Sequence, residues 1–293
     1  MKIVQGEELQ WQRGLEHRGG IFHNRLLMEG EPGTVDNFQL SMGRMGGAFF
    51  SPRHRHNFEQ IRFQLDGELD FARDGRMKTG MVGYFPEGMF YGPQSQDPEG
   101  TPITIVLQMG GASGSGYLSR AEVKAGMDAL QPEGEFKDGV FRRHKDVPGK
   151  RNVDGYQAIW EHVNKRPLAY PKPRYSRPFM MDPTHYEWLA SADELGVAEK
   201  LMGVFTERRS TARFLRLDPG ATHRASGRSL YFVIEGAGTV EGEPLQNLTT
   251  VYLRRGEQAT FTAREETRML HLGMPDLTGV ASQGAGVTAA AAE

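Results

Sequence analysis

Two stretches of this chain carry the same pattern of apolar and turn residues, 169 residues apart. Residues 62–67 read Arg-Phe-Gln-Leu-Asp-Gly, and residues 231–236 read Tyr-Phe-Val-Ile-Glu-Gly. The same offset places His54 on His223. Solenoids and propellers repeat every ~20–50 residues, so a spacing this long indicates two copies of one domain. The sequence therefore predicts two domains of similar fold in one chain.

Each copy consists of short apolar runs separated by turn signals. In the first copy, strands are expected at residues 38–42, 60–65, 68–71, 81–85 and 102–109. Aspartate precedes glycine at turns between them, as in Asp66-Gly67 and Asp74-Gly75. A second strand-rich block runs from about residue 203 to residue 275. Regularly spaced short strands without intervening helices predict an all-β fold, with an antiparallel barrel or sandwich in each copy.

The segment between the two copies has a different sequence pattern. Ser119 and Glu122 form a capping box ahead of spaced apolar residues, which predicts one helix over residues 119–130. Residues 140–185 are rich in Arg, Pro and Tyr and are expected to form an extended connector along a surface. The expected domains are an N-terminal arm with the first barrel (1–115), the helix and connector (116–200), a second, degenerate barrel (201–277) and a disordered tail (278–293).

The composition excludes several classes of site and partner. The 293-residue chain contains no Cys, so it has neither disulfides nor thiolate metal ligands. Its formal net charge of −2 gives no electrostatic reason to expect binding to nucleic acid or to an anionic membrane. No apolar run approaches the ~18 residues of a membrane span, and the N-terminus has no apolar signal core. We therefore expect a cytoplasmic protein whose partner is a small molecule.

Two histidines one residue apart, His54 and His56, precede the strand expected at 60–65. Side chains two residues apart on an extended segment point to the same face, so both imidazoles can enter one cavity. Converging imidazoles are common ligands of divalent transition metals. The matching positions in the second copy hold His223 and Ala225. The first copy is therefore the candidate active domain, and the second is expected to be structural.

These motifs resemble those of the cupin superfamily, in its two-domain bicupin arrangement. The first cupin motif, a glycine followed by His-x-His and a later glycine, corresponds here to Gly47, His54, His56 and Gly67. The second motif, with Tyr replacing its usual His, corresponds here to Gly80, Pro86, Gly88 and Tyr91. The resemblance implies two cupin barrels, which are double-stranded β-helices of the jelly-roll type. It also implies a homodimer, because cupins commonly pair their barrels.

Cupin metal sites use the two His of the first motif, often a Glu there, and a third His from the second motif. The resemblance therefore assigns His54 and His56 as metal ligands. Gln60 stands in the Glu position, and Tyr91 stands in the position of the third His. Gln is a weak, neutral oxygen ligand, and Tyr ligates a metal as a phenolate. Alternatively, Tyr91 is a pocket hydroxyl that donates a hydrogen bond to a substrate oxygen or to metal-bound water.

The phase of the strand after His56 decides which side chains face the cavity. If the alternation continues, Gln60 and Arg62 point inward, and Arg62 would bind the carboxylate of an anionic substrate. If a turn resets the phase, the apolar residues between them face the interior instead. The first alternative makes Tyr91, Arg62 and Gln60 the catalytic candidates. Gln108, on a later strand, is a further candidate.

The first motif looks most like that of gentisate-type ring-cleaving dioxygenases, which are bicupins with three His on Fe(II). This resemblance implies an enzyme with dioxygenase-like chemistry on a small organic acid or phenol. Fe(II) is the favoured metal, with Mn, Ni and Zn as alternatives. Decarboxylase, lyase and isomerase chemistry stay open, because a fold does not fix a reaction. The other hypothesis is a metal-free, non-catalytic protein that binds or senses a small molecule.

Overall fold

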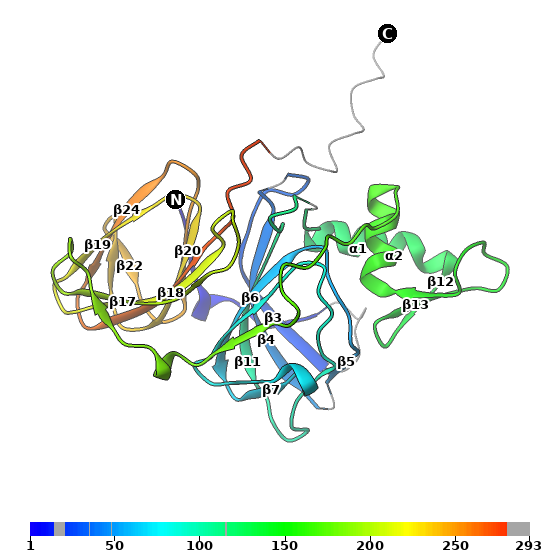
Figure 1. Ribbon diagram of the computed structural model, residues 1–293, viewed down its shortest axis with the longest axis horizontal. Coiled ribbons are helices and arrows are strands. Elements are labelled where there is room, and N and C mark those ends of the chain that lie inside the picture. Colours follow the sequence, from blue (N-terminus) through cyan, green and yellow to red (C-terminus); the bar gives the residue numbers. More distant parts are fainter. Residues whose placement is uncertain (15–20, 35, 48, 115, 280–293) are drawn as a thin grey trace, which may run out of the picture. The chain divides into compact units, whose positions relative to one another are not determined.

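The computed structural model describes residues 1–14, 21–34, 36–47, 49–114 and 116–279 (Figure 1). These residues divide into two compact units. The first-barrel unit comprises residues 12–24, 29–180 and 277–279, and the second-barrel unit comprises residues 1–11, 25–28 and 181–276. Both consist mainly of antiparallel strands, so the predicted all-β fold is confirmed. From residue 280 on, the predicted tail lies outside the described residues.

The first barrel is built from two antiparallel sheets. The strands of its larger sheet are β2 (Gln12–Arg13), β3 (Ile21–Glu29), β4 (Phe38–Gly46), β6 (Glu59–Asp66), β9 (Val82–Phe85), β11 (Ile103–Met109) and β15 (Phe179–Met181). Those of its smaller sheet are β5 (Phe50–Ser51), β7 (Glu68–Asp70), β8 (Arg76–Lys78) and β10 (Gln94–Ser95). The orders are β15-β9-β6-β11-β4-β3-β2 and β5-β10-β7-β8. The five strands predicted in this copy correspond to β4, β6, β7, β9 and β11.

The second-barrel unit repeats this arrangement. The strands of its larger sheet are β1 (Lys2–Gln5), β16 (Leu189–Ala190), β17 (Val197–Val204), β18 (Thr211–Leu217), β20 (Ser229–Glu235), β23 (Thr249–Leu253) and β25 (Thr267–Gly273). Those of its smaller sheet are β19 (Thr222–Ser226), β21 (Gly238–Val240), β22 (Glu243–Leu245) and β24 (Gln258–Ala263). The orders are β1-β23-β20-β25-β18-β17-β16 and β19-β24-β21-β22. Position by position, β20 stands where β6 stands and β25 where β11 stands, which confirms the predicted repeat.

The N-terminal strand lies in a different barrel from the one the sequence suggested. We expected residues 1–115 to form one unit, but β1 pairs with β23, where Ile3 faces Val251. Ile3 also packs against the apolar core of the second barrel, and this burial favours that pairing over an arm on the first barrel. In the first barrel, β15 takes the corresponding place beside β9.

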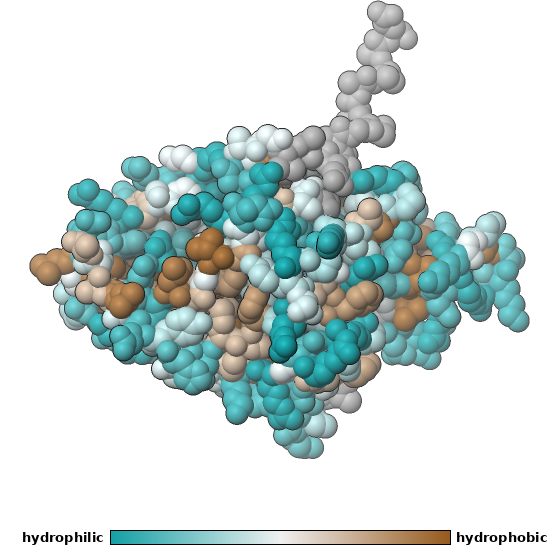
Figure 2. Space-filling model, viewed as in Figure 1, coloured by the Kyte–Doolittle hydropathy of each residue, from teal (hydrophilic) through white to brown (hydrophobic). Residues whose placement is uncertain are grey.

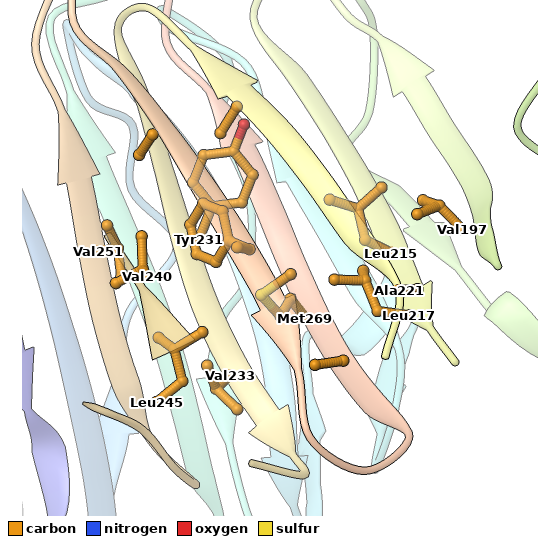
Figure 3. Packing of buried hydrophobic residues seen from close by; sticks show 14 of the residues in the cluster. Val197, Leu215, Leu217, Ala221, Tyr231, Val233, Val240, Leu245, Val251 and Met269 are labelled. Carbon is orange, nitrogen blue, oxygen red and sulfur yellow. The ribbon is translucent and has the colours of Figure 1, made fainter. Parts of the chain in front are cut away.

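A continuous apolar core fills the second barrel (Figure 3). Tyr231 and Val233 alternate along β20 and share a face, where they pack with Leu215 and Met269. The 169-residue offset places Arg62 and Gln64 at the corresponding positions of the first barrel. The two barrels therefore share a topology but differ in the polarity of their interiors.

An insert, residues 117–164, follows the first barrel in the sequence and belongs to the first-barrel unit. The predicted helix is confirmed as α1 (Arg120–Leu130), and its Ser119–Glu122 capping box is formed. A second helix, α2 (Gly155–Asn164), was not predicted; Asp154 caps it by accepting a hydrogen bond from Gln157 N. Between the helices lies a small sheet of β12 (Gly134–Lys137), β13 (Val140–Arg143) and β14 (Asn152–Asp154). The extended connector predicted from residue 140 therefore begins only after α2.

The insert has an apolar core of its own. Val123 and Leu130 of α1 pack in one cluster with Ile159 and Trp160 of α2. Phe58, which precedes β6, belongs to the same cluster and so attaches the insert to the barrel. Gly126 lies where α1 meets α2, and a Cβ there would come within 3.0 Å of Ile159 and Val163 side-chain atoms. The insert is thus a packed extension of the barrel rather than a flexible link.

The face shown in Figure 2 is largely hydrophilic, with small apolar patches. Exposed apolar side chains of the second-barrel unit include Leu189, Leu195 and Leu201. Short 3-10 helices occupy Gly6–Glu8, Ala72–Asp74, Gln131–Glu133 and Pro183–His185. None of the helices in the described ranges is long and apolar enough to cross a membrane.

Candidate active site

The segment that carries the two histidines lies beside the segment that carries Tyr91. His54 N donates to Tyr91 O at 3.1 Å, and Tyr91 N donates to His54 O at 2.9 Å. Gly88 N donates to His56 O at 2.7 Å. Gly88 has a φ of +77°, and a Cβ there would clash with the carbonyl of Pro171, so the turn requires glycine. The Pro-x-Gly turn thus brings the second motif against the first.

The side chains of both histidines converge on the hydroxyl of Tyr91. The distances to the hydroxyl oxygen are 3.0 Å from His54 Nε2 and 3.1 Å from His56 Nε2. His54 Nδ1 lies 2.6 Å from the carbonyl oxygen of Pro52. Because a carbonyl only accepts, His54 Nδ1 carries the proton, and Nε2 keeps its lone pair. Imidazoles that ligate metals are oriented by this kind of contact.

Arg62 and Gln60 complete this cluster from β6. Both line the cavity, so the strand phase continues from His56, and the alternative with the apolar residues inward is wrong. Arg62 donates through Nε and Nη2 to Gln60 Oε1, at 3.0 and 2.6 Å. It also donates to the Tyr91 hydroxyl and to Gln94 Oε1, each at 3.0 Å. The guanidinium therefore holds Tyr91 and the two amides in place.

A cavity of about 200 Å³ opens beside the cluster within the first barrel. His54, His56 and Tyr91 line it, together with Gln60 and Arg62. Its apolar wall is formed mainly by Phe22, Met45, Phe49, Phe58, Val106 and Val123. No carboxylate of the described residues lines it, whereas Arg13, Arg62 and Arg120 do. The cavity is therefore suited to a small, partly apolar, anionic molecule.

The insert closes one side of this cavity. Tyr117, Arg120 and Val123 line it from α1 and the segment before it, and Tyr156 lines it from α2. Burial raises the pKa of Tyr117 and of Tyr156 well above the usual value, so both hydroxyls stay protonated. Tyr117 donates to Gln108 Oε1 at 2.9 Å. The insert thus forms part of the cavity wall rather than a connector alone.

Two groups of hydrogen bonds, one around Glu87 and one around Arg53, hold the segment that contains Tyr91 in place. Glu87, which is buried, accepts hydrogen bonds from Ser113 N (2.9 Å) and Ser113 Oγ (2.6 Å) and pairs with Arg174 Nη1 at 2.6 Å. On the other side, Arg53 donates to the carbonyl oxygens of Gly92 (2.6 Å) and Phe90 (2.7 Å). The position of the Tyr91 ring therefore depends on residues far from it in sequence.

Sequence reasoning missed several residues of the site. Ser51 and Gln94 lie on β5 and β10, which pair with each other, and Gln94 accepts from Arg62. Arg120 and Tyr156 come from the insert. The N-cap pattern Asp154-x-x-Gln157 could have revealed the helix that carries Tyr156. The strands of Ser51 and Gln94 are two residues long, which is too short to give a periodic signal.

The donor set indicates how a metal would be held. In the described part of the chain, no three His, Cys, Asp or Glu side chains are placed to hold a metal ion, so Tyr91 would be the third ligand. Metal–nitrogen bonds of ~2.0–2.1 Å put neighbouring ligand atoms ~3 Å apart around an octahedral ion. The spacings of 3.0 and 3.1 Å between the Tyr91 hydroxyl and the two Nε2 atoms fit such a site. Gln60 Oε1 instead accepts hydrogen bonds from Arg62.

The corresponding place in the second barrel has different chemistry. His223 Nδ1 lies 2.7 Å from Glu194 Oε2, and Arg213 Nε donates to His271 Nδ1 at 3.0 Å. His271 therefore carries its proton on Nε2 when neutral, which removes that atom as a metal ligand. Tyr231, which stands where the first barrel has Arg62, packs against His271 with the ring centroids 4.7 Å apart. The first barrel thus contains the better-formed candidate site.

Comparisons with solved structures identify the fold. No protein-family model matches the sequence, and neither does any curated protein. A candidate dioxygenase of Nostoc punctiforme aligns over 96% of this chain and 85% of its own, with a TM-score of 0.62 and 11% identity. Oxalate decarboxylase of Bacillus subtilis aligns over 94% of this chain and 76% of its own, with a TM-score of 0.53 and 12% identity. Protein Ylba of E. coli aligns over 93% of this chain and 90% of its own, with a TM-score of 0.55 and 7% identity.

These likenesses extend over nearly the whole chain and include both barrels. The chain therefore has the two-barrel cupin fold that the sequence resemblance implied. Identities this low show the fold and leave the reaction to be argued from the site.

Proposed function

We propose that the first barrel is a metal-dependent active site that acts on a small organic acid or phenol, with dioxygenase-like chemistry. The supporting observation is that two imidazole Nε2 atoms meet one phenol oxygen beside a cavity of the first barrel. His54, His56 and Tyr91 would hold the metal. Fe(II) is favoured, and Mn, Ni and Zn accept the same donors. Solved structures with this fold, described as a candidate dioxygenase and an oxalate decarboxylase, are consistent with an enzyme.

The metal, when bound, would supply Lewis acidity and, if it is iron, a site for O₂. The remaining tasks belong to the protein. The Pro52 carbonyl holds the His54 ring, and Arg62 places a positive charge 3.0 Å from the Tyr91 oxygen, where it offsets the charge of a phenolate. His54, Arg62 and Tyr91 are buried, and burial strengthens these electrostatic interactions.

A second candidate function is metal-free binding of a small molecule. It is favoured by the way the hydrogen bonds close without a metal. The Tyr91 hydroxyl accepts from Arg62 and lies within hydrogen-bond distance of His54 Nε2, His56 Nε2 and Gln60 Oε1. In this case the imidazoles would serve as acid, base or ligand-binding groups.

Metal content separates the two candidates. The full chain is purified without oxygen, reconstituted with Fe(II), Mn(II), Ni(II) or Zn(II), desalted and analysed by plasma mass spectrometry. We expect near-stoichiometric metal in the wild type and none in His54→Ala/His56→Ala. His223→Ala, at the matching position of the second barrel, is the control and should retain the metal. If the wild type retains none of the four metals, the metal-dependent proposal fails and metal-free binding becomes the better account.

A further inference from the structure

The anion predicted for this cavity needs a partner other than Arg62. A guanidinium binds a carboxylate best through two parallel N–H groups. In Arg62, Nε and Nη2 donate to Gln60, Nη2 also donates to Tyr91, and Nη1 donates to Gln94. Binding a carboxylate there would break contacts that hold Tyr91 in place. The sequence-based role of Arg62 as a carboxylate clamp is therefore poorly matched to its surroundings.

Arg120 has free donors and faces the same cavity. It is the first residue of α1, is half-buried and lines the cavity wall. Its one hydrogen bond within the described residues runs from Nη1 to Asn24 Oδ1, at 2.8 Å. Asn24 is buried on β3, so this bond fixes the guanidinium without neutralising it. Four of its five N–H groups are thus left for a ligand.

The strand order places Arg120 across the cavity from the histidine cluster. In the sheet order β6-β11-β4-β3, Gln60 of β6 faces Gln108 of β11, which in turn faces Gln39 of β4. Asn24, which holds Arg120, lies on the next strand. Adjacent strands are ~4.8 Å apart, so the backbones of β6 and β3 are ~14 Å apart, and the side chains that extend inward from both ends shorten the span left for a ligand. Gln39 lines the cavity and forms no side-chain hydrogen bond within the described residues.

The apolar wall indicates what lies between the two ends. Phe22 and Phe49 pack with ring centroids 6.3 Å apart, and Phe58 packs edge to face against Tyr156 at 5.4 Å. Cavities of ~150 Å³ lined by apolar groups accept benzene. The volume of about 200 Å³ found here therefore has room for one six-membered ring with a small substituent.

We infer that Arg120, assisted by the amide of Gln39, determines substrate specificity by binding the carboxylate of a single-ring organic acid. The ring lies against the apolar wall, and its far end points toward His54, His56 and Tyr91. This inference rests on the proposed function in placing the reacting end at those residues. Recognition itself requires neither metal nor reaction. The specificity of the first barrel would then come from the insert.

Benzoate and its neutral isostere benzamide test the inference by calorimetric titration of the full chain. We expect the wild type to prefer benzoate. Arg120→Gln should weaken benzoate binding roughly 10- to 100-fold, the value of a charge-assisted hydrogen bond, and leave benzamide binding unchanged. Arg120→Lys keeps the positive charge but loses the paired, parallel N–H donors of the guanidinium, so it should give an intermediate affinity for benzoate. Lys124→Gln, which removes an exposed charge from the same helix, is the matched control and should behave as wild type.

Three results would overturn the inference: a wild type that binds neither ligand or both equally, an Arg120→Gln variant that keeps its preference for benzoate, or an equal loss in Lys124→Gln. Thermal unfolding of each variant shows whether it is folded. Metal analysis of Arg120→Gln should match the wild type, because this residue does not contact the histidines. A chain that prefers benzoate through Arg120 but holds no metal would refute the proposed function and leave this inference standing.

Discussion

At the centre of the site, one hydroxyl oxygen lies within hydrogen-bond distance of four side chains, one of which is Gln60 at 3.3 Å. The Tyr91 hydroxyl lies 3.0 Å from His54 Nε2, 3.1 Å from His56 Nε2 and 3.0 Å from Arg62 Nη2. Tyr91→Phe removes that oxygen and leaves these buried groups without their shared partner. An unmade buried hydrogen bond costs ~1–3 kcal/mol, so we expect the free energy of unfolding to fall by about that amount. We also expect bound metal to be lost. Urea unfolding and metal analysis measure the two effects.

Two further tyrosine variants provide the comparisons needed to interpret the Tyr91→Phe result. Tyr186 is half-buried, and its hydroxyl forms no hydrogen bond within the described residues, so Tyr186→Phe should leave both quantities unchanged. Tyr91→His supplies a third imidazole and should retain metal. If Tyr91→Phe holds as much metal as the wild type, Tyr91 is not a ligand and acts only as a hydrogen-bonding hydroxyl.

The residues of the site differ in how well a sequence can reveal them. His54 and His56 stand two apart in a recognisable motif, and Tyr91 occupies a motif position, so spacing alone is enough to find them. Arg62 and Gln60 required the phase of β6 after a loop, which a sequence leaves open. Nothing near Arg120 signals a ligand, because its role depends on Asn24, 96 residues away. Long-range pairing of this kind cannot be read from local pattern.

Among the elements, the turn that carries Tyr91 is held by a buried ion pair. Glu87 is 1% exposed and Arg174 is 25% exposed. Arg174→Gln leaves a buried carboxylate without its cation, so we expect a loss of about 3 kcal/mol in the free energy of unfolding. Arg174→Gln/Glu87→Gln should lose less than the sum of the two single variants, because they share one interaction. Urea unfolding of the four proteins gives the coupling energy.

A surface ion pair of the same barrel provides the comparison. Arg76 is 61% exposed and pairs with Glu68 at 2.9 Å, so Arg76→Gln should change stability by less than ~1 kcal/mol. Equal losses in Arg76→Gln and Arg174→Gln, or additive losses in the double variant, would show that the Glu87–Arg174 pair does not hold the turn.

The elements of the barrels were easier to predict than those of the insert. Strands such as β6 and β11 are bounded by turn residues, and α1 has a complete capping box. Helix α2 carries apolar residues at 156, 159, 160 and 163, which is a helical spacing, and Asp154 stands at its N-cap. The Pro- and Arg-rich residues after it favoured an extended interpretation of the whole segment. A local helical signal was thus outweighed by the composition of its surroundings.

At the scale of the whole molecule, the two barrels share one strand order but have interiors of different polarity. The repeat was predictable because β6 and β20 keep the same pattern at a fixed offset. The assignment of β1 to the second barrel was not, because a four-residue strand carries too little pattern to choose between two similar sheets. The interiors differ through a few positions, such as Arg62 against Tyr231. Polar residues line the cavity of the first barrel, whereas an apolar core fills the second.

We expect one buried histidine to make the second barrel sensitive to acid. His271 is buried beside Arg213, and burial, followed by the charge of Arg213, lowers its pKa well below the usual 6.5. Unfolded His binds a proton near pH 6.5 while folded His271 stays neutral, so stability falls as the pH drops below that value, by up to ~1.4 kcal/mol per pH unit. His271→Gln keeps an acceptor for Arg213 and should flatten this fall, measured by urea unfolding at pH 7.5 and 5.0 with hydrogen exchange in β25. His185→Gln, at an exposed position of the same unit, should keep the wild-type slope. An unchanged slope in His271→Gln would place the acid sensitivity elsewhere.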